Sequence, residues 1–298
     1  MQAVHPVAPS SRRATAKAGS GRAGDWGTAL LLAPALILLA LFLVSVVQMI
    51  ALSFEDGDGY GLRHYIEFFA RPDYVATYLR TLSVAAMVTV SSVLIGYPIA
   101  YGIWRHQGNR NFLMILVLLP WLVSVVVRTY AWMVILGPRG VINEALAWLG
   151  VIDAPLKLMF NTTGVVIGLV HVLVPFMIIS ILSVLLHFDR RLEEASMSLG
   201  GDRLHTFIKV TLPLSLSGVI AGATLTYLMA TGAIVTPLLL GGIRERMIGT
   251  QIYQEVMQTF NFPKASALAT LLLLGGLVAI LPLQWLERRV SRAAGPGA

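Results

Sequence analysis

Cysteine is absent from the chain and charged residues are scarce, and both deficits restrict its class. Without cysteine, disulfide bonds and thiolate metal sites are excluded. Only 12% of the 298 residues are charged and 56% are hydrophobic, whereas a soluble domain carries about 25% charged residues. Together the two departures indicate a protein that is embedded in a membrane.

Six long apolar runs contain no aspartate, glutamate or lysine. A helix needs about 20 apolar residues to cross a bilayer, and every run reaches that length. The runs are continuously apolar and do not alternate, so they predict helices and not barrel strands. They comprise Thr28–Leu52, Leu82–Ile103, Phe112–Leu136, Thr163–Leu186, Leu214–Leu240 and Ala265–Leu286. The expected fold class is therefore all-α, a polytopic membrane protein with six transmembrane helices.

Outside these runs the sequence predicts two tails and several short connections. Residues 1–27 are expected to be a disordered tail, residues 28–286 one transmembrane domain and residues 287–298 a second tail. The first run has 25 residues, whereas the apolar region of a cleavable signal peptide has about 7–15, so it is predicted to be a span. Gly140–Gly150 carries a helical apolar stripe and is expected to form a short interfacial helix.

The distribution of basic residues predicts the orientation. If the N-terminus is inside, the inner segments hold thirteen Lys and Arg residues and the longer outer loops hold eight. The positive-inside rule then places both termini in the cytoplasm. The net charge of +7 is expected to face anionic lipid and cytoplasmic partners and not nucleic acid.

Residues 188–213 form a charged, amphipathic loop between the fourth and fifth runs. Asp189 is positioned to cap a first helix, which Gly200 and Gly201 would end. Asp202 is positioned to cap a second helix, and Pro213 marks the entry to the fifth run. The pattern predicts a helix, a glycine turn and a second helix at the inner face of the membrane.

Two interpretations of this loop are open. An amphipathic loop resting on lipid headgroups accounts for its apolar stripe. It does not account for the small residues around the carboxylate in Glu194-Ala195-Ser196. Small side chains allow a helix to enter a groove on another protein, where a carboxylate binds the partner's donors.

The spacing within this loop resembles the EAA motif of bacterial ABC importer permeases, the inner-membrane components of binding-protein-dependent transport. That motif runs Glu-Ala-Ala, three residues, Gly, nine residues, Ile, any residue, Leu-Pro. Here Ser196 replaces the second Ala and Val210 replaces Ile. The resemblance implies that the loop is a coupling helix that seats in a cleft of a separate ATP-binding subunit. The residues that it assigns to coupling are Glu194, Ala195, Ser196, Gly200, Leu212 and Pro213.

A second resemblance narrows the subgroup. Leu119–Gly137, Val235–Gly242 and Asn261–Ala267 are similar to segments of spermidine/putrescine permeases, although Phe262 stands where Trp is expected. The resemblance implies import of a polyamine or a related small cationic solute. Permeases for amino-acid-like or opine-like solutes share much of this pattern and remain the alternative.

The resemblance also implies the partners. An ATP-binding cassette subunit, expected as a homodimer, would bind ATP and Mg, while this chain binds no cofactor or metal. The other expected partners are a second, paralogous permease, a periplasmic or lipoprotein solute-binding protein, and the lipid bilayer. No lysine follows a glycine, so the phosphate-binding motif GxxxxGK[ST] is absent, and the chain is expected to be a transport subunit and not an enzyme.

Six residues are candidates for the solute path or gate. Arg128 is the only charge inside a run, and it either extends to the membrane surface, pairs structurally or acts in gating. Tyr130 and Trp132 offer aromatic faces to a cation or belong to an interfacial belt. Thr236 and Pro237 lie where glycine and proline weaken the fifth run, and Glu255 meets a solute or is a surface carboxylate. An ion-coupled secondary transporter would need carboxylates inside the spans, and the runs contain none.

Overall fold

The computed structural model describes residues 23–57 and 59–293. The chain divides into two compact units, Met1–Gln48 and Met49–Ala298. Helix α1 (Ala23–Leu52) forms the described part of the first unit and ends within the second. Its side chains from Leu32 onward are almost all exposed, as expected for an apolar helix that lipid surrounds. The predicted tail 1–27 lies outside the described residues up to residue 22, whereas 287–293 of the predicted second tail continue the last helix, α13 (Phe262–Ala293).

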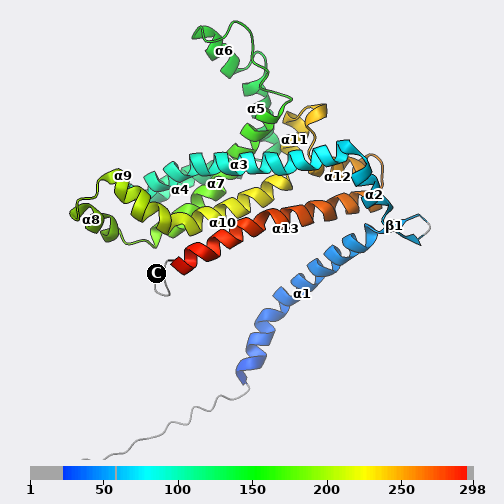
Figure 1. Cartoon of the computed structure of the whole chain (residues 1–298), viewed down its shortest axis with the longest axis horizontal. Helices are drawn as coiled ribbons and strands as arrows, with labels where there is room; N and C mark the ends of the chain where they lie inside the picture. Colours follow the sequence, from blue (N-terminus) through cyan, green and yellow to red (C-terminus); the bar gives the residue numbers. More distant parts are fainter. Residues whose placement is uncertain (1–22, 58, 294–298) are drawn as a thin grey trace, which may run out of the picture. The chain divides into compact units, whose positions relative to one another are not determined.

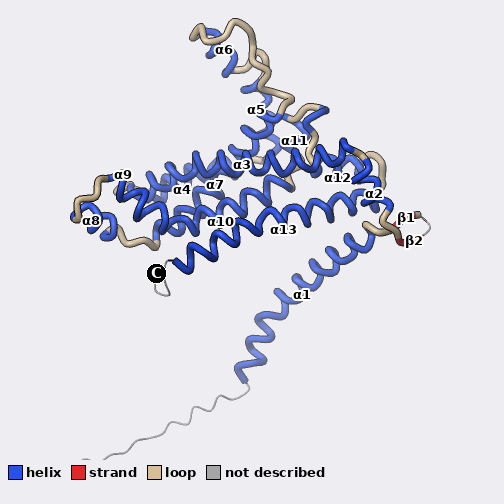
Figure 2. Tube along the Cα trace, viewed as in Figure 1, coloured by secondary structure: helices blue, strands red, loops and turns tan. Residues whose placement is uncertain are grey.

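The second unit is helical apart from one short hairpin, in which Glu55 pairs with Tyr60 (Figure 2). Its elements before the fourth span are β1 (Glu55–Asp56), β2 (Gly59–Tyr60), α2 (Arg63–Ala70), α3 (Pro72–Arg105), α4 (Arg110–Leu118), the 3-10 helix η1 (Leu119–Leu122), α5 (Val125–Leu136) and α6 (Val141–Trp148). They are followed by α7 (Thr162–Leu186), α8 (Arg191–Ser198), α9 (Arg203–Thr206), the π-helical turn η2 (Phe207–Thr211), α10 (Leu212–Thr231), α11 (Val235–Leu240), the 3-10 helix η3 (Ile243–Glu245), α12 (Ile248–Met257) and α13 (Phe262–Ala293).

The core of this unit is the junction of α3, α7 and α10, which run side by side (Figure 1). Met177 of α7 is fully buried at its centre. Gly96 of α3 and Gly222 of α10 both face it, since a Cβ added there would lie 3.0 and 2.8 Å from its side chain. Small residues allow membrane helices to approach closely, where dispersion forces hold them together without a hydrophobic driving force. The glycines therefore set the spacing of the three helices.

The prediction of a six-span, all-α membrane protein is confirmed. Within the described residues, six helical segments are long and apolar enough to cross a membrane. They are Leu32–Leu52, Pro72–Arg105, Val125–Trp148, Thr162–Leu186, Arg203–Thr231 and Phe262–Trp285. The short helix expected within Gly140–Gly150 is also present, as α6, and its position at the interface stays a prediction.

The third and fifth runs are each divided, and the division of the fifth falls where glycine and proline were expected to weaken it. The third run, Phe112–Leu136, is divided into α4, η1 and α5, with extended backbone at Val123. The fifth run is divided after Thr231, and α11 begins at Val235. Broken helices are tolerated at membrane depth where neighbouring protein satisfies the freed backbone groups. The second span is longer than expected, because α3 begins at Pro72 and not near Leu82.

Candidate functional site

The 188–213 loop forms the predicted helix, glycine turn and helix. Asp189 Oδ1 accepts a hydrogen bond from the Arg191 backbone N–H at 2.9 Å, and Asp202 Oδ1 accepts one from His205 at 2.6 Å. Helix α8 therefore begins beside one aspartate, and α9 begins after the other. Both α8 and α9 lie at one end of α3 and α10, while α2 and α12 lie at the other end (Figure 1).

Gly200 and Gly201 make the turn between the two helices. Gly200 has a φ of +90°, a left-handed conformation that side chains with a Cβ rarely adopt. The Gly201 N–H donates to the Ser196 carbonyl at 3.1 Å. The Ser196 hydroxyl also lies 3.0 Å from the Thr206 hydroxyl, which links α8 to α9. Ser196 is thus a structural link within the loop.

The tip of the loop presents an exposed carboxylate and exposed apolar side chains. Glu194 is exposed, while Leu199 and Leu204 are 90% and 66% exposed. Gly200 and Gly201 line an open recess of about 410 Å³ beside them. At the base of the loop, Leu212 is half-buried and Pro213 exposed. The residues assigned to coupling therefore divide into an exposed tip and a base that continues into α10.

Glu193, which the sequence did not single out, lies on the opposite face of α8. It is 6% exposed, and its Oε1 accepts hydrogen bonds from the Thr211 hydroxyl at 2.5 Å and the Tyr101 hydroxyl at 3.3 Å. Arg105 Nη1 lies 3.8 Å from Oε2 and donates to the Tyr101 hydroxyl at 2.8 Å. No local pattern marks Glu193 as inward-facing, because its partners Tyr101 and Thr211 are distant in the sequence.

A second set of contacts fastens the loop to the end of α3. The Arg190 guanidinium donates to the Trp104 carbonyl and lies 5.2 Å from the centre of the Trp104 ring. Phe188 packs against that ring with centroids 5.8 Å apart, and Phe207 packs against Tyr101 at 5.3 Å. Both ends of the loop therefore contact the last turns of α3.

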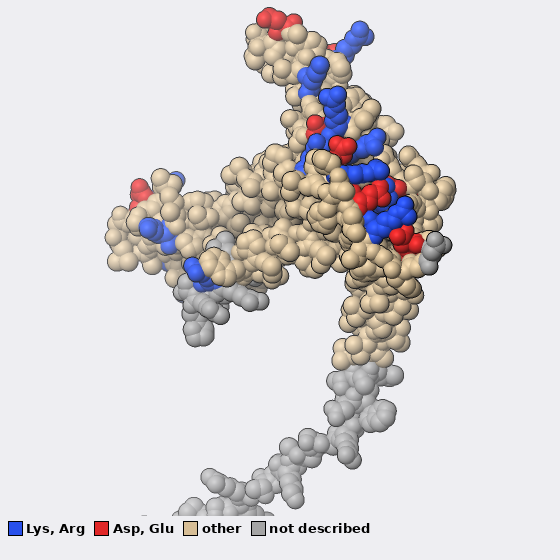
Figure 3. Space-filling model, turned by 45° about the vertical axis from the view of Figure 1, so that its right-hand side comes forward, with Lys and Arg blue, Asp and Glu red and all other residues tan. Residues whose placement is uncertain are grey.

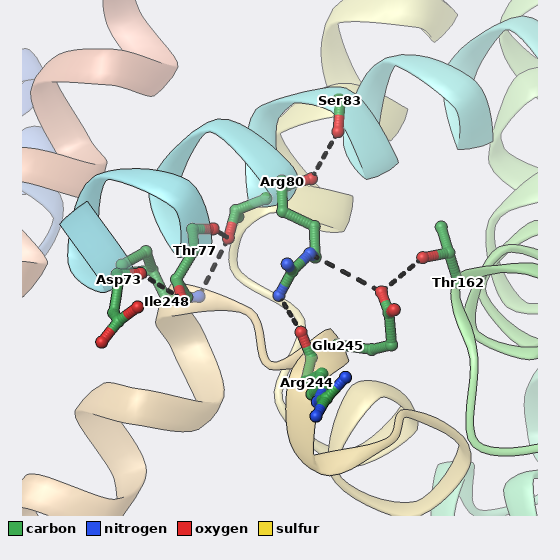
Figure 4. A network of polar contacts seen from close by, with 9 residues as sticks. Asp73, Thr77, Arg80, Ser83, Thr162, Arg244, Glu245 and Ile248 are labelled. Atoms are coloured by element: carbon green, nitrogen blue, oxygen red, sulfur yellow. Dashed lines mark hydrogen bonds and ion pairs between the residues drawn. The ribbon is translucent and has the colours of Figure 1, made fainter.

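The other end of α3 is held by a polar network (Figure 4). Arg80 Nε lies 3.6 Å from Glu245 Oε2, and its guanidinium donates to the Arg244 carbonyl. Glu245 Oε2 also accepts from the Thr162 hydroxyl at 2.6 Å. The Ile248 N–H donates to the Thr81 hydroxyl at 2.9 Å. These contacts join α3 to η3, α12 and the start of α7.

Five of the six solute-path candidates lie on α5 and α11, which pack against each other. The Thr129 and Thr236 hydroxyls are 3.4 Å apart, and Pro237 is buried beside them. Arg128 precedes Thr129 and is 9% exposed, and Trp132 lies one turn later with its ring centroid 5.5 Å from that of His171. The structure therefore gathers Arg128, Trp132, Thr236 and Pro237 around α5, α7 and α11.

The interpretation that Arg128 extends to the membrane surface stays a prediction, as do structural pairing and a role in gating. The Nε and Nη1 atoms of Arg128 are buried and have no hydrogen-bond partner among the described residues. The interpretation assumed one continuous helix from Phe112, and that helix is broken before Val125. Two buried guanidinium nitrogens without a partner are costly, which favours a partner or solute group that binds them.

Two candidates are not part of this cluster: Tyr130, on the exposed side of α5, and Glu255, on α12. Tyr130 is 54% exposed. Glu255 lies in α12, where its Oε1 is 3.1 Å from Lys264 Nζ and its side chain is 12% exposed. The expectation of an exposed surface carboxylate at Glu255 is therefore wrong, because an ion pair holds it against α13.

Charged side chains gather at the two ends of the second unit, and a belt of uncharged side chains separates them on the face that Figure 3 shows. Together with the six spans, this distribution defines the chain as a multi-pass membrane protein. Residues 92–292 match the family described as "Binding-protein-dependent transport system inner membrane component". The chain belongs to this family, whose members are permease subunits of ABC importers.

Several relatives are spermidine/putrescine permeases. The chain is 34% identical over 212 residues to the spermidine/putrescine transport system permease protein PotB of Escherichia coli K12, covering 70% of this chain and 77% of that protein. It is 33% identical over 240 residues to PotB of Haemophilus influenzae, covering 78% and 84%. The resemblance to this subgroup is confirmed.

Solved structures share the fold. A bacterial alginate ABC transporter in complex with an alginate-bound periplasmic protein superposes with a TM-score of 0.73 at 20% identity, covering 90% of this chain and 96% of that one. The MetNI methionine ABC transporter superposes with a TM-score of 0.55 at 18% identity, covering 74% and 95%. Both likenesses establish the permease architecture.

Proposed function

We propose that this chain is one permease of an ATP-driven importer for polyamines or a related small cationic solute. The similarity to PotB proteins over most of the chain supports the solute class. The observation that carries the coupling role is the arrangement of the 188–213 loop. Its tip presents an exposed carboxylate and apolar side chains, while its base is attached to α3 and continues into α10. The loop faces the cytoplasm, as do both termini, in agreement with the excess of basic residues on that side.

The loop transmits work from a separate ATPase. The chain carries no phosphate-binding motif, so ATP and Mg bind to a partner ATP-binding cassette subunit that acts as a homodimer. The Glu194 carboxylate pairs with donors in a cleft of that subunit, and Leu199 and Leu204 bury their exposed surfaces there. Closure of the ATPase dimer then moves α8 and α9, and the contacts of Glu193 and Arg190 carry the motion to α3.

The solute path includes Arg128, Trp132, Thr236 and Pro237, with Tyr130 on the exposed side of α5. A second, paralogous permease completes the pathway, and an external solute-binding protein delivers the solute. Alternating access results when the spans rock between outward- and inward-facing arrangements. Glu255 is left out of the path, because Lys264 already neutralises it.

A second candidate solute class is amino-acid-like or opine-like, and Arg128 favours it. The buried guanidinium has Nε and Nη1 unpartnered among the residues described, and the six apolar runs offer no carboxylate to a polyamine. An α-carboxylate on the solute would satisfy the guanidinium through charge-assisted hydrogen bonds.

Uptake in whole cells tests both classes. The permease is expressed with its ATPase, second permease and binding protein in a strain that lacks polyamine import, and labelled putrescine, spermidine, arginine and octopine are supplied. Uptake of putrescine or spermidine, lost when the ATPase is inactivated, supports the first class. Uptake of arginine or octopine alone supports the second. Uptake that persists without the ATPase but collapses with the ion gradient would refute the proposal.

A further inference from the structure

A recess lined by arginines lies at the end of α3 that is remote from the 188–213 loop. We name it the arginine recess and define it by Arg71, Arg80, Arg244 and Arg246, which surround a volume of about 550 Å³. Asp73 is the only acidic side chain in its lining. Tyr101, which holds Glu193, lies 21 residues beyond Arg80 on the same helix. At 1.5 Å per residue the two sites are about 32 Å apart.

Two of the four arginines are already neutralised. Arg71 pairs with Glu67 at 3.2 Å, and Arg80 pairs with Glu245 at 3.6 Å. Arg244 and Arg246 are exposed, and neither has a carboxylate within 4.0 Å among the described residues. Arg246 donates only to the Gln254 side chain, at 3.3 Å. The recess therefore presents two guanidinium groups that are available to an anionic partner.

These two arginines are mounted on a rigid support. The Arg244 backbone carbonyl accepts from Arg80, while its own side chain stays exposed (Figure 4). Glu245 between them is held by Arg80 and Thr162, and the following helix α12 is tied to Thr81. A guanidinium on a fixed backbone loses less freedom on binding and pairs with carboxylates through two parallel hydrogen bonds.

The surroundings fit a protein surface better than a lipid headgroup. Ile243 is 84% exposed beside Arg244, so an apolar anchor stands next to the free charges. Arginine next to apolar side chains is typical of protein interfaces. In the proposed orientation the recess faces the outside, where basic residues are disfavoured by the positive-inside rule, so a cluster of four requires a reason.

We infer that the arginine recess is the docking site for an acidic patch on the solute-binding protein. This inference rests on the proposed function, since it requires a binding protein. The docked carboxylates would pair with Arg244 and Arg246, and an apolar side chain would cover Ile243. Because Arg80 links this surface to α3, docking on the outside and the Glu193 contact on the inside act on the two ends of one helix.

The test uses the complete importer in liposomes and measures ATP hydrolysis as solute-loaded binding protein is titrated. The variant is Arg244→Glu with Arg246→Glu. We expect the concentration of binding protein that gives half-maximal stimulation to rise about tenfold or more, since like charges then face each other. In the wild type that concentration should rise with salt, because exposed charges are screened over about 8 Å at physiological ionic strength. A short poly-glutamate peptide should compete with the binding protein for the wild type and not for the variant.

Arg139→Glu with Lys157→Glu is the matched control, since both residues are exposed and lie outside the recess. In this control the concentration of binding protein that gives half-maximal stimulation should stay at the wild-type value. An equal rise of that concentration in the control would overturn the inference. The inference would also be overturned if the recess variant kept the wild-type half-maximal concentration, or if that concentration rose only in liposomes that contain anionic lipid. If no loaded binding protein stimulates even the wild type, the proposed function fails and not the docking site alone.

Discussion

Glu193 and Glu194 are neighbours in the sequence and face opposite environments. Glu193 is 6% exposed and accepts hydrogen bonds from Thr211 and Tyr101. Glu194 is exposed at the tip of the loop. Successive residues on a helix are about 100° apart, so one helical turn provides both an attachment to α3 and a surface for a partner. Coupling needs both, because a docking surface that moved independently of the spans would transmit nothing.

The first prediction separates these two roles. Glu193→Ala leaves the Thr211 and Tyr101 hydroxyls without their acceptor in a buried site, at a cost of about 1–3 kcal/mol. We expect the ATPase to remain bound and to hydrolyse ATP, while solute uptake per ATP falls by about tenfold. Glu194→Ala, its matched control, should instead weaken binding of the ATPase subunit. Co-purification together with uptake and ATP hydrolysis in liposomes distinguishes the two. Equal losses of ATPase binding in both variants would contradict the assignment of Glu193.

The second prediction concerns the turn at Gly200. Nothing lies within 4 Å of a Cβ built there, but its φ of +90° strains any side chain, at about 1–3 kcal/mol. Gly200→Arg should abolish uptake and leave membrane insertion intact, since it adds bulk where the ATPase docks. Gly150 is the matched control, because its φ is +68° and its surroundings are equally open. Gly150→Arg should retain most of the uptake. If both variants transport alike, the turn has no special role in coupling.

The sequence predicted the spans and the helix–turn–helix, because both depend on local composition. Apolar length defines a span, and Asp189, Asp202 and Gly200 mark the ends of the two helices within a few residues. Glycine and proline marked the weak point in the fifth run, but proline alone did not predict which runs break. Pro98 and Pro175 lie inside continuous helices, whereas the third run breaks just after Pro120. Whether a helix breaks depends on which neighbours satisfy its backbone, and that is a property of the tertiary structure.

The candidate site shows the same limit. The sequence predicted that a carboxylate of the loop would be exposed, but it did not show that the adjacent Glu193 points inward. That direction is set by Tyr101 and Thr211, which are 92 and 18 residues away in the sequence. The burial of Arg128 likewise follows from the break before Val125 and the packing of α5 against α11.

The third prediction tests the packing of α10 against α7. A Cβ at Gly218 would lie 2.8 Å from the Ser180 backbone carbonyl, whereas the nearest atom to one at Gly222 is the flexible Met177 sulfur, at 2.8 Å. Backbone cannot move aside as a side-chain end can, so Gly218→Ala should destabilise more, by about 1–3 kcal/mol. Thermal unfolding in detergent measures the difference. A lower melting temperature for Gly222→Ala than for Gly218→Ala would contradict the packing.

The fourth prediction addresses Arg128. Replacing a buried charge that lacks partners with an apolar side chain of similar length removes its desolvation cost, and such changes are often neutral or stabilising. Arg128→Met should therefore keep or raise the melting temperature of the permease, while solute uptake falls by about tenfold or more because the guanidinium acts on the solute or the gate. Arg128→Lys should not restore uptake, since an ammonium lacks the planar, forked donors of a guanidinium. Val126→Met is the control, because Val126 lies on the same helix and is exposed, and its uptake should match the wild type. Should Arg128→Met transport normally, the guanidinium has no part in the path; should it unfold instead, the buried charge is bound by a partner that the permease needs for stability.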